Sequence, residues 1–390
     1  QRTHGRRDLP RYRFDQAAVI VSIDADFLGT WIAPVEFTQG WREGRSLTGT
    51  PPRSSYHVQI EPRLSLTGTK ADARLRIRPS AVGAVVAQLA ARIAARAGAP
   101  FDAAAAGDPG VDAAALDDIA GRLWQARHAS LIVSGSQDPA VQALVNTANQ
   151  LLGSYGHTLD LDRPSFQRRG DDGALAALLD ELRAGRVAAL LVAGANPAYD
   201  LPEAEEFAAL ARRAGMAVSF AGAPDETSAL ASHVCPDHHF LEAWGDAEPV
   251  AGVVSVRQPA IRPLAATRAM AETLAAWSGD RRPAYELLRD HWRTAVFTRQ
   301  AAQPSFDAFW DSAVHDGVAS LDAGRPAAAP EPARHAPAAG PSAPAAAAAL
   351  PAAPEALPAG SLELVLYPTV SMLDGRHVQN PWLHELPDPV

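Results

Sequence analysis

The chain has 390 residues, one cysteine (Cys235) and a formal net charge of −9. At about 150 residues per domain, this length predicts two or three domains. A single cysteine excludes intrachain disulfides, cysteine-ligated iron–sulfur clusters and four-cysteine zinc sites within the chain. Arginine supplies all basic residues except Lys70, and an acidic chain without basic runs is a poor binder of nucleic acid.

The first half of the chain alternates strand and helix patterns. Strands are expected over residues 17–23, 56–60 and 131–134, where short β-branched or apolar runs occur. Helices are expected over residues 31–41 and 79–97, the latter because its apolar residues share one face. Asp138 and Pro139 form an N-terminal capping signal for a further helix that ends at Gly153.

The same alternation continues after residue 170, with helices expected over 174–184 and 203–214 and strands over 187–192 and 217–220. Repeated units of this kind predict parallel sheets with helices on both faces. Ligands of such sheets bind beyond the carboxyl ends of the strands, so the turns after Ile23, Ser134, Val192 and Phe220 are the candidate sites. Residues 267–277, 285–297 and 306–314 read as helices.

Near the end of the chain, 26 of the 35 residues between Pro326 and Gly360 are alanine or proline. This composition predicts a semi-rigid, mostly disordered linker. The expected domains are therefore residues 1–125 and 126–265 as two α/β domains and 266–324 as a helical extension. The linker covers 325–360, and 361–390 begins an incomplete C-terminal domain whose first strand is 362–367. No stretch reaches 18 consecutive strongly apolar residues, so no membrane span is expected.

Three groups of polar residues carry candidate chemistry. His233, Cys235, Asp237, His238 and His239 have the composition of a metal site, but their spacing matches no strong motif, and a polar loop is the favoured interpretation. Asp24 and Asp26 follow the first strand as solvated turn carboxylates, with an acid–base pair as the alternative. No G-x-G-x-x-G, Walker A or G-x-S-x-G motif occurs.

The third group is the turn Gly194, Ala195, Asn196, Pro197, which follows an apolar strand. Backbone N–H groups in such a turn can donate hydrogen bonds to a phosphate at a helix N-terminus. The alternative interpretation is a turn without a ligand.

A family resemblance rests on several segments in order: residues 12–15, 20–31, 57–68, 194–200, 225–227, 239–246 and 379–389. Together they resemble the molybdopterin-oxidoreductase superfamily. They are more closely similar to its cofactor-less branch, which forms the large iron–sulfur subunit of alternative complex III. The resemblance implies two Rossmann-like α/β domains, which in catalytic relatives hold the two guanine-dinucleotide ends of the pterin cofactor.

The resemblance places the turns after Ile23 and Val192 at equivalent positions of the two domains. Only the turn after Val192 keeps the residues of a phosphate-binding turn, so a vestigial pterin site is expected at that turn. Its residues are Gly194, Asn196, Pro197, Asp225, Glu226 and Thr227. Carboxylates occupy the first turn, at Asp24 and Asp26, where they would repel a pyrophosphate. No molybdenum ligand or catalytic residue is assigned, and molybdopterin is expected to be absent.

The implied function is a non-catalytic scaffold in a membrane-associated respiratory complex that oxidises quinol. Expected partners are iron–sulfur, c-type haem and quinol-binding membrane subunits, at the periplasmic side of the bacterial inner membrane. Iron–sulfur clusters are expected in a downstream region or in those partners, because relatives carry further chain on both sides of this sequence. The alternatives are a truncated, catalytic molybdopterin-dependent oxidoreductase and a free-standing α/β binding protein.

Overall fold

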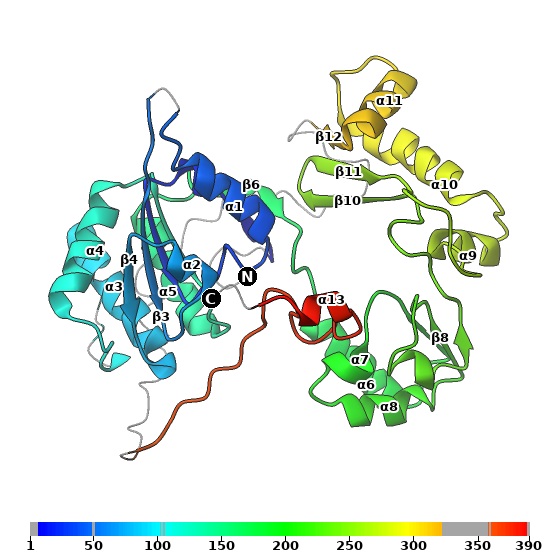
Figure 1. The fold of residues 1–390 in the computed structure, drawn as a ribbon, viewed down its shortest axis with the longest axis horizontal. Helices are drawn as coiled ribbons and strands as arrows, with labels where there is room; N and C mark the ends of the chain where they lie inside the picture. The colour runs from blue at the N-terminus through cyan, green and yellow to red at the C-terminus, as the bar shows by residue number, and fades with distance from the viewer. Residues whose placement is uncertain are drawn as a thin grey trace. The chain divides into compact units, whose positions relative to one another are not determined.

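The computed structural model describes residues 7–48, 51–101, 103, 106–321, 358 and 360–387. The chain divides into two compact units, Gln1–Arg168 with Ala333–Val390 (unit 1) and Arg169–Pro332 (unit 2). Most of the predicted linker lies outside the described residues. Figure 1 labels many of the helices and strands of both units and colours them along the chain.

Unit 1 is built on a four-stranded parallel sheet, in the order β4-β3-β2-β5. The strands are β2 (Val19–Ile23), β3 (Tyr56–Glu61), β4 (Ala73–Arg76) and β5 (Ser130–Ser134). Ile23 is level with Ile60 and with Ser134, so β2, β3 and β5 end together at one edge. Every residue of β2 is buried, as the continuous β-branched run predicts for a central parallel strand.

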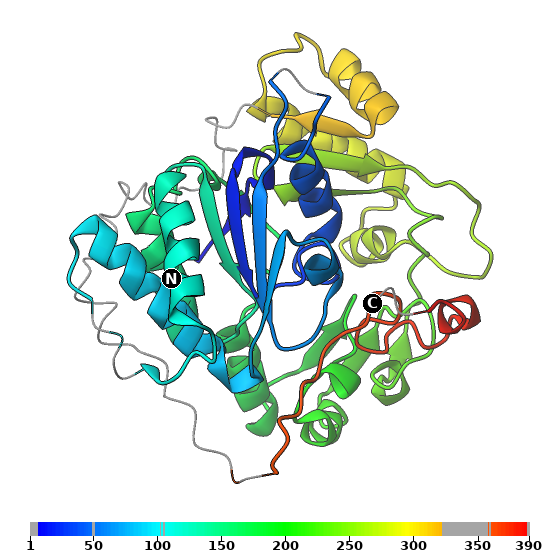
Figure 2. The same cartoon turned by 60° about the vertical axis from the view of Figure 1, so that its left-hand side comes forward.

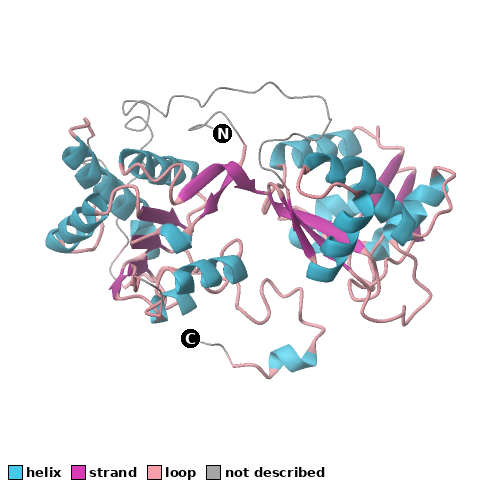
Figure 3. Ribbon diagram, turned by 90° about the horizontal axis from the view of Figure 1, so that it is seen from above, coloured by secondary structure: helices cyan, strands magenta, loops and turns pink. Residues whose placement is uncertain are grey.

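Helices cover both faces of this sheet (Figures 2 and 3). Val19, Val21 and Ile23 share a core with α3 (Val82–Ala97), α4 (Ala113–Gln125) and α5 (Pro139–Leu151). Ile20 points to the opposite face, where it packs with Phe14 and Phe37 of η1 (Phe14–Gln16) and α1 (Pro34–Glu43). The predicted α/β class, with helix-flanked parallel sheets, is confirmed.

The turn η2 (Pro79–Ala81) and α3 form one segment, Pro79–Ala97, that is long and apolar enough to cross a membrane by length and composition alone. No such segment was expected, because the sequence has no run of 18 strongly apolar residues. Half of its apolar window is buried, and Val85, Leu89 and Ile93 pack in the core of unit 1. These contacts are those of a core helix in an α/β domain.

The predicted capping signals of α5 are present. The Asp138 carboxylate accepts a hydrogen bond from the N–H of Ala140 at 2.7 Å, and Pro139 occupies the first turn. Gly153 follows the helix with a φ of +66°, the left-handed conformation that glycine adopts without strain.

Two further strands of unit 1, β1 (Leu9–Tyr12) and β6 (Leu159–Ser165), pair antiparallel. A short helix, α2 (Leu66–Thr69), follows β3, and α13 (Pro381–His384) lies in the C-terminal segment. The predicted strand over 362–367 is wrong, because these residues are extended but join no sheet among the described residues.

Unit 2 contains a three-stranded parallel sheet of β7 (Ala189–Val192), β8 (Met216–Ser219) and β9 (His233–Val234). The helices α6 (Asp172–Arg183), α7 (Pro197–Asp200) and α8 (Ala204–Ala211) accompany it, and η4 (Ser228–Leu230) precedes β9. Leu190 of β7 packs with Leu182 of α6 and Phe207 of α8.

The remainder of unit 2 combines antiparallel strands with helices. The strands are β10 (Gly245–Val250), β11 (Val253–Arg257) and β12 (Val318–Ser320). The helical elements are α9 (Met270–Trp277), α10 (Ala284–His291), η5 (Trp292–Val296), η6 (Phe297–Arg299) and α11 (Phe306–Asp316). Val254 and Val256 of β11 share a core with Trp292 and Trp310.

One predicted domain boundary needs correction, and the description of one predicted segment needs an addition. The limit between 125 and 126 falls inside unit 1, because β5 hydrogen-bonds to β2 and completes the first sheet. The extension 266–324 is mainly helical, as expected, but it also contains β12 (Val318–Ser320), which pairs with β11. Both points concern strand pairings between residues distant in sequence, which local patterns do not specify.

Candidate functional site

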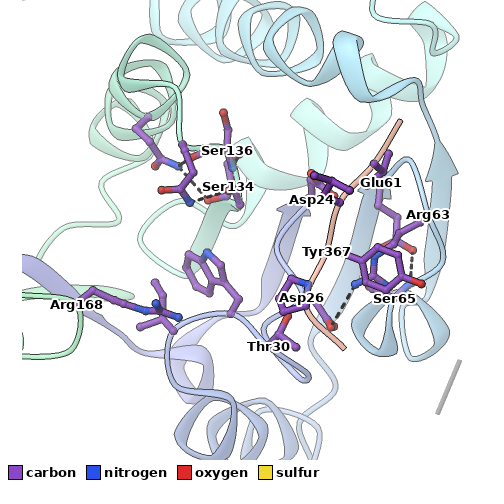
Figure 4. A pocket seen from close by; sticks show the side chains of 18 of the residues that line it. Asp24, Asp26, Thr30, Glu61, Arg63, Ser65, Ser134, Ser136, Arg168 and Tyr367 are labelled. Atoms are coloured by element: carbon purple, nitrogen blue, oxygen red, sulfur yellow. Dashed lines mark hydrogen bonds and ion pairs between the residues drawn. The ribbon is translucent and has the colours of Figure 1, made fainter. Parts of the chain in front are cut away.

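A cavity of about 760 Å³ opens in unit 1 at the carboxyl ends of β2, β3 and β5 (Figure 4). The predicted turns after Ile23 and Ser134 both line it. It is also lined by three segments that the sequence analysis did not connect with them, namely residues 61–65, Arg168 and residues 365–368. The polar lining groups are Asp24, Asp26, Thr30, Glu61, Arg63, Ser65, Ser134, Ser136, Gln137, Gln142 and Arg168.

The Asp26 side chain is buried, with 9% of its surface exposed, so its prediction as a solvated turn carboxylate is wrong. Its Oδ1 accepts hydrogen bonds from the backbone N–H of Thr67 at 3.0 Å and from the Thr67 hydroxyl at 2.8 Å. Arg63 lies 4.0 Å from Oδ2. These bonds satisfy the carboxylate and fasten the turn after β2 to α2.

Asp24 is the carboxylate of this turn that remains open to solvent. Its φ of +54° is left-handed, a conformation that aspartate tolerates better than most residues. Protein atoms still surround much of the group, and this desolvation raises the pKa of Asp24 to about 6. Repulsion from Glu61 adds to the increase, while Arg63 opposes it. Asp24 therefore titrates closer to neutral pH than an ordinary aspartate, which suits proton exchange more than phosphate binding.

Glu61 ends β3 with only 1% of its surface exposed. Its carboxylate accepts hydrogen bonds from Arg74 at 2.6 Å, from Gln59 at 3.0 Å, and from the N–H and hydroxyl of Ser65. Glu61 thus combines one ion pair, with Arg74, and several hydrogen bonds at the wall of the cavity. This role leaves no local signal in the sequence, because only the pairing of β3 with β4 brings Arg74 next to Glu61.

His57 lies further along β3, buried beside the rings of Phe27 and Trp41. Neither ring nitrogen has a hydrogen-bond partner among the described residues. Burial lowers the pKa of His57 to about 4, so the imidazole is neutral at physiological pH. His57 belongs to the core and does not line the cavity.

The turns after β2 and β5 meet at Gly135, because these neighbouring parallel strands end level with each other. The N–H of Gly135 donates to the carbonyl of Ile23 at 2.9 Å. A Cβ at this position would collide with the backbone carbonyl of Asp24. Glycine is therefore required here for the close approach of two backbones.

In unit 2, the predicted site residues after β7 and β8 are brought together by Asn196. Its Oδ1 accepts from the N–H of Thr227 at 3.1 Å and from the Thr227 hydroxyl at 2.6 Å. Its Nδ2 donates to Glu226 at 2.7 Å. The Thr227 hydroxyl also accepts from the N–H of Ala198 at 3.0 Å. One amide thus joins the two turns.

Gly194, Pro197 and Asp225, the remaining predicted site residues, determine the backbone course of the turns after β7 and β8. Gly194 has a φ of +62°, and Pro197 occupies the first turn of α7, where no N–H is needed. Asp225 accepts from the N–H of Ser228 at 2.6 Å and so closes the loop before η4.

The carboxylates around Asn196 test whether a pyrophosphate fits this turn. Glu226 is held by the Asn196 amide, which lowers the pKa of its carboxyl and keeps it ionised. Asp200 lies 3.4 Å from the backbone N of Asn196. The amide donors of the turn therefore already face carboxylates of the chain itself. These residues do not fit an anionic phosphate, since like charges would be added to occupied donors.

In the segment 233–239, His233 and Val234 form β9, and residues 235–239 form a polar loop after it. The Asp237 carboxylate accepts a hydrogen bond from the N–H of Met270 at 2.7 Å, at the start of α9. The His238 ring contacts the Thr267 hydroxyl at 2.6 Å. Within the described residues, no group of three or more His, Cys, Asp or Glu could hold a metal ion.

Comparisons with known proteins agree with this architecture. The chain is 28% identical over 305 residues to the menaquinone reductase molybdopterin-binding-like subunit of Nitratidesulfovibrio vulgaris strain Hildenborough, covering 69% of the chain. It spans only 44% of that relative. No family model matches.

Among solved structures, acetylene hydratase from Pelobacter acetylenicus superposes with a TM-score of 0.53 at 12% sequence identity. This match covers 82% of the chain and 54% of the hydratase. It shows the fold alone, which is that of the molybdopterin oxidoreductases. The sequence match and the fold together support the superfamily predicted from the motifs.

Proposed function

We propose that this chain is a non-catalytic core portion of a membrane-associated respiratory complex that oxidises quinol, of the alternative complex III type. Its similarity to a subunit of a menaquinone reductase supports a respiratory, oxidoreductase-type role. The chain would act as a scaffold, while redox centres in adjacent regions or subunits carry the electrons.

The observation that carries the scaffold proposal is the chemistry of the two sheet ends. Asp24 and Asp26 occupy the turn after β2, and Glu226 and Asp200 surround the turn after β7. A pterin dinucleotide would bring a pyrophosphate to such turns, and each would meet it with carboxylates. The alternative, a catalytic molybdopterin oxidoreductase, would need free N–H groups in the turns themselves, in addition to the cationic groups Arg63 and Arg168 that line the cavity of unit 1.

The expected partners are iron–sulfur, c-type haem and quinol-binding membrane subunits, at the periplasmic side of the bacterial inner membrane. Iron–sulfur clusters would belong to those partners or to further regions of the protein, and molybdopterin would be absent. A chain with the fold of a cofactor-binding enzyme then serves as a rigid platform for docking.

The proposal is tested by altering both sheet ends in the assembled complex. Asp24→Asn and Asn196→Ala are introduced together, and the complex is purified from membranes and assayed for quinol oxidation. If the chain is a scaffold, the rate stays within about twofold of the wild type, because neither residue takes part in chemistry. A loss of about 100-fold or more in a fully assembled complex would contradict the proposal and favour a cofactor site.

A further inference from the structure

The residues 361–368, here called the strap, lie extended along the cavity of unit 1. Val365, Leu366, Tyr367 and Pro368 form part of its wall, although more than 200 residues separate them from the ends of β2, β3 and β5. Figure 4 shows the strap passing between Asp24 on one side and Arg63 on the other. The strap therefore covers the sheet edge at which ligands of parallel α/β sheets bind.

One anchor of the strap is Glu363 at the start of the Pro79–Ala97 helix. Its carboxylate accepts from the N–H of Ser80 at 2.8 Å and from the Ser80 hydroxyl at 2.9 Å. The residue before this helix, Arg78, makes no side-chain capping bond within the described structure. Glu363 therefore supplies the acceptor and the negative charge that the first turn of a helix favours.

The second anchor is the ring of Tyr367, which lies over the guanidinium of Arg63 at 3.8 Å from ring centroid to Cζ. Arg63 is itself positioned by the carbonyl of Leu64 at 3.1 Å and by the nearby Asp26 carboxylate. The stacking is a cation–π contact, and the Arg63 guanidinium that makes it is held in place by neighbouring residues of unit 1.

Between the anchors the strap is held lightly. Leu364 is 83% exposed, and Leu366 is 86% exposed although it also lines the cavity, so neither side chain is buried against unit 1. In the described part of the chain, the strap also forms no strand pairing with the sheet. Two side-chain anchors without a ladder of backbone bonds are the features of a segment that opens locally at low cost.

We propose that the strap is a latch: it docks over the carboxyl-end cavity through Glu363 and Tyr367, and it lifts to expose the cavity wall. The closed position leaves the ring of Tyr367 on Arg63, and the open position frees this guanidinium for another planar or anionic group. The latch is independent of the scaffold role, because it concerns access to the cavity and not what the complex does.

The experiment measures how fast a cysteine in the cavity reacts. Ser136, which lines the cavity on the side of β5, is replaced by cysteine in a chain whose native thiol is removed by Cys235→Ser. Labelling by a maleimide is compared between this parent and the double variant Glu363→Gln, Tyr367→Ala. The latch predicts labelling that is about tenfold faster in the double variant, since loss of both anchors raises the open population.

Two matched variants separate the latch from general loosening. Leu364→Ala changes an exposed strap residue that faces away from both anchors, and it leaves the labelling rate unchanged. Tyr367→Phe keeps the stacked ring and also leaves the rate unchanged. Equal rates in the parent and the double variant, or an increase in Leu364→Ala as large as in the double variant, would overturn the proposal. Thermal unfolding confirms in each case that the fold is intact.

Discussion

Each of the two units has a parallel sheet, and the turns at the carboxyl ends of these sheets are stabilised in different ways. In unit 1, the turn after β2 buries Asp26 against Thr67 and leaves Asp24 beside a cavity. In unit 2, the turn after β7 is joined by Asn196 to Thr227 and Glu226 near the surface. The sheet end of unit 1 borders a cavity, whereas the polar groups at the sheet end of unit 2 hydrogen-bond to one another.

The two turns therefore differ in their chemistry, although each follows a parallel strand of its own sheet. A phosphate site requires N–H donors without partners and an environment free of carboxylates. Unit 1 fails the second requirement and unit 2 fails both. The fold alone therefore does not decide the function, and the residues in the turns do.

The largest effect is expected from Gly135→Ala, which tests how tightly the turns of unit 1 are packed. The added Cβ would meet the backbone carbonyl of Asp24, which cannot move without shifting β2. We expect the free energy of unfolding to fall by about 3 kcal/mol in urea titrations.

Gly121→Ala is the matched control in the same unit. Gly121 lies inside α4, and a Cβ there meets only the end of the Arg96 side chain at 3.9 Å. This variant should be more stable by about 0.5–1 kcal/mol, as expected for alanine in a helix. A loss of the same size in both variants would refute the close approach at Gly135.

A smaller effect is expected from Asn196→Ala, which tests whether one amide joins the turns of unit 2. The variant loses the acceptor of two bonds from Thr227 and the donor to Glu226. Because the site is partly exposed, we expect a loss of about 1–2 kcal/mol in the unfolding of unit 2. Asn196→Asp, which keeps the acceptor, should lose less at low pH, where Glu226 is protonated. No loss in Asn196→Ala would mean that the turns are held by other contacts.

The smallest effect is a pH-dependent one at Asp24. Its pKa of about 6 in the folded chain lies above the usual 3.8, so the folded state binds more protons between these values. Its contribution to stability is complete below pH 3.8 and is lost as the pH rises through 6. Asp24→Asn should therefore stabilise the chain at pH 8, by about 1 kcal/mol after allowing for solvent screening, and not at pH 3.5.

Glu226→Gln is the counterpart in unit 2. The pKa of Glu226 is lowered by the Asn196 amide, so its contribution is present above its usual pKa and is lost as the pH falls through the folded pKa. Thermal unfolding at pH 8 should show no gain in this variant. If Glu226→Gln gained as much stability at pH 8 as Asp24→Asn, the two sheet ends would not differ in their electrostatics, and the comparison would be contradicted.

Local patterns were sufficient to predict β2, β5 and the caps of α5, because their signals lie within a few residues. The motifs also led to Asn196, Glu226 and Thr227, which the structure brings together. The burial of Asp26 could not be predicted, since Thr67 lies 41 residues away.

The same reason explains the other features that were missed. The ion pair of Glu61 with Arg74 depends on the pairing of β3 with β4. The strap was expected to begin a separate domain, because alternating apolar residues are typical of a strand. Its anchors, Ser80 and Arg63, lie about 300 residues earlier in the chain and leave no local signal.

The most direct test of the scaffold proposal is the molybdenum, tungsten and pterin content of the complex purified from membranes with this chain in place. Metal analysis by mass spectrometry and fluorescence of the oxidised, extracted pterin give two independent values per chain. We predict that both are far below one per chain, while quinol oxidation is retained. One molybdenum or tungsten per chain with an equal amount of pterin would contradict the account.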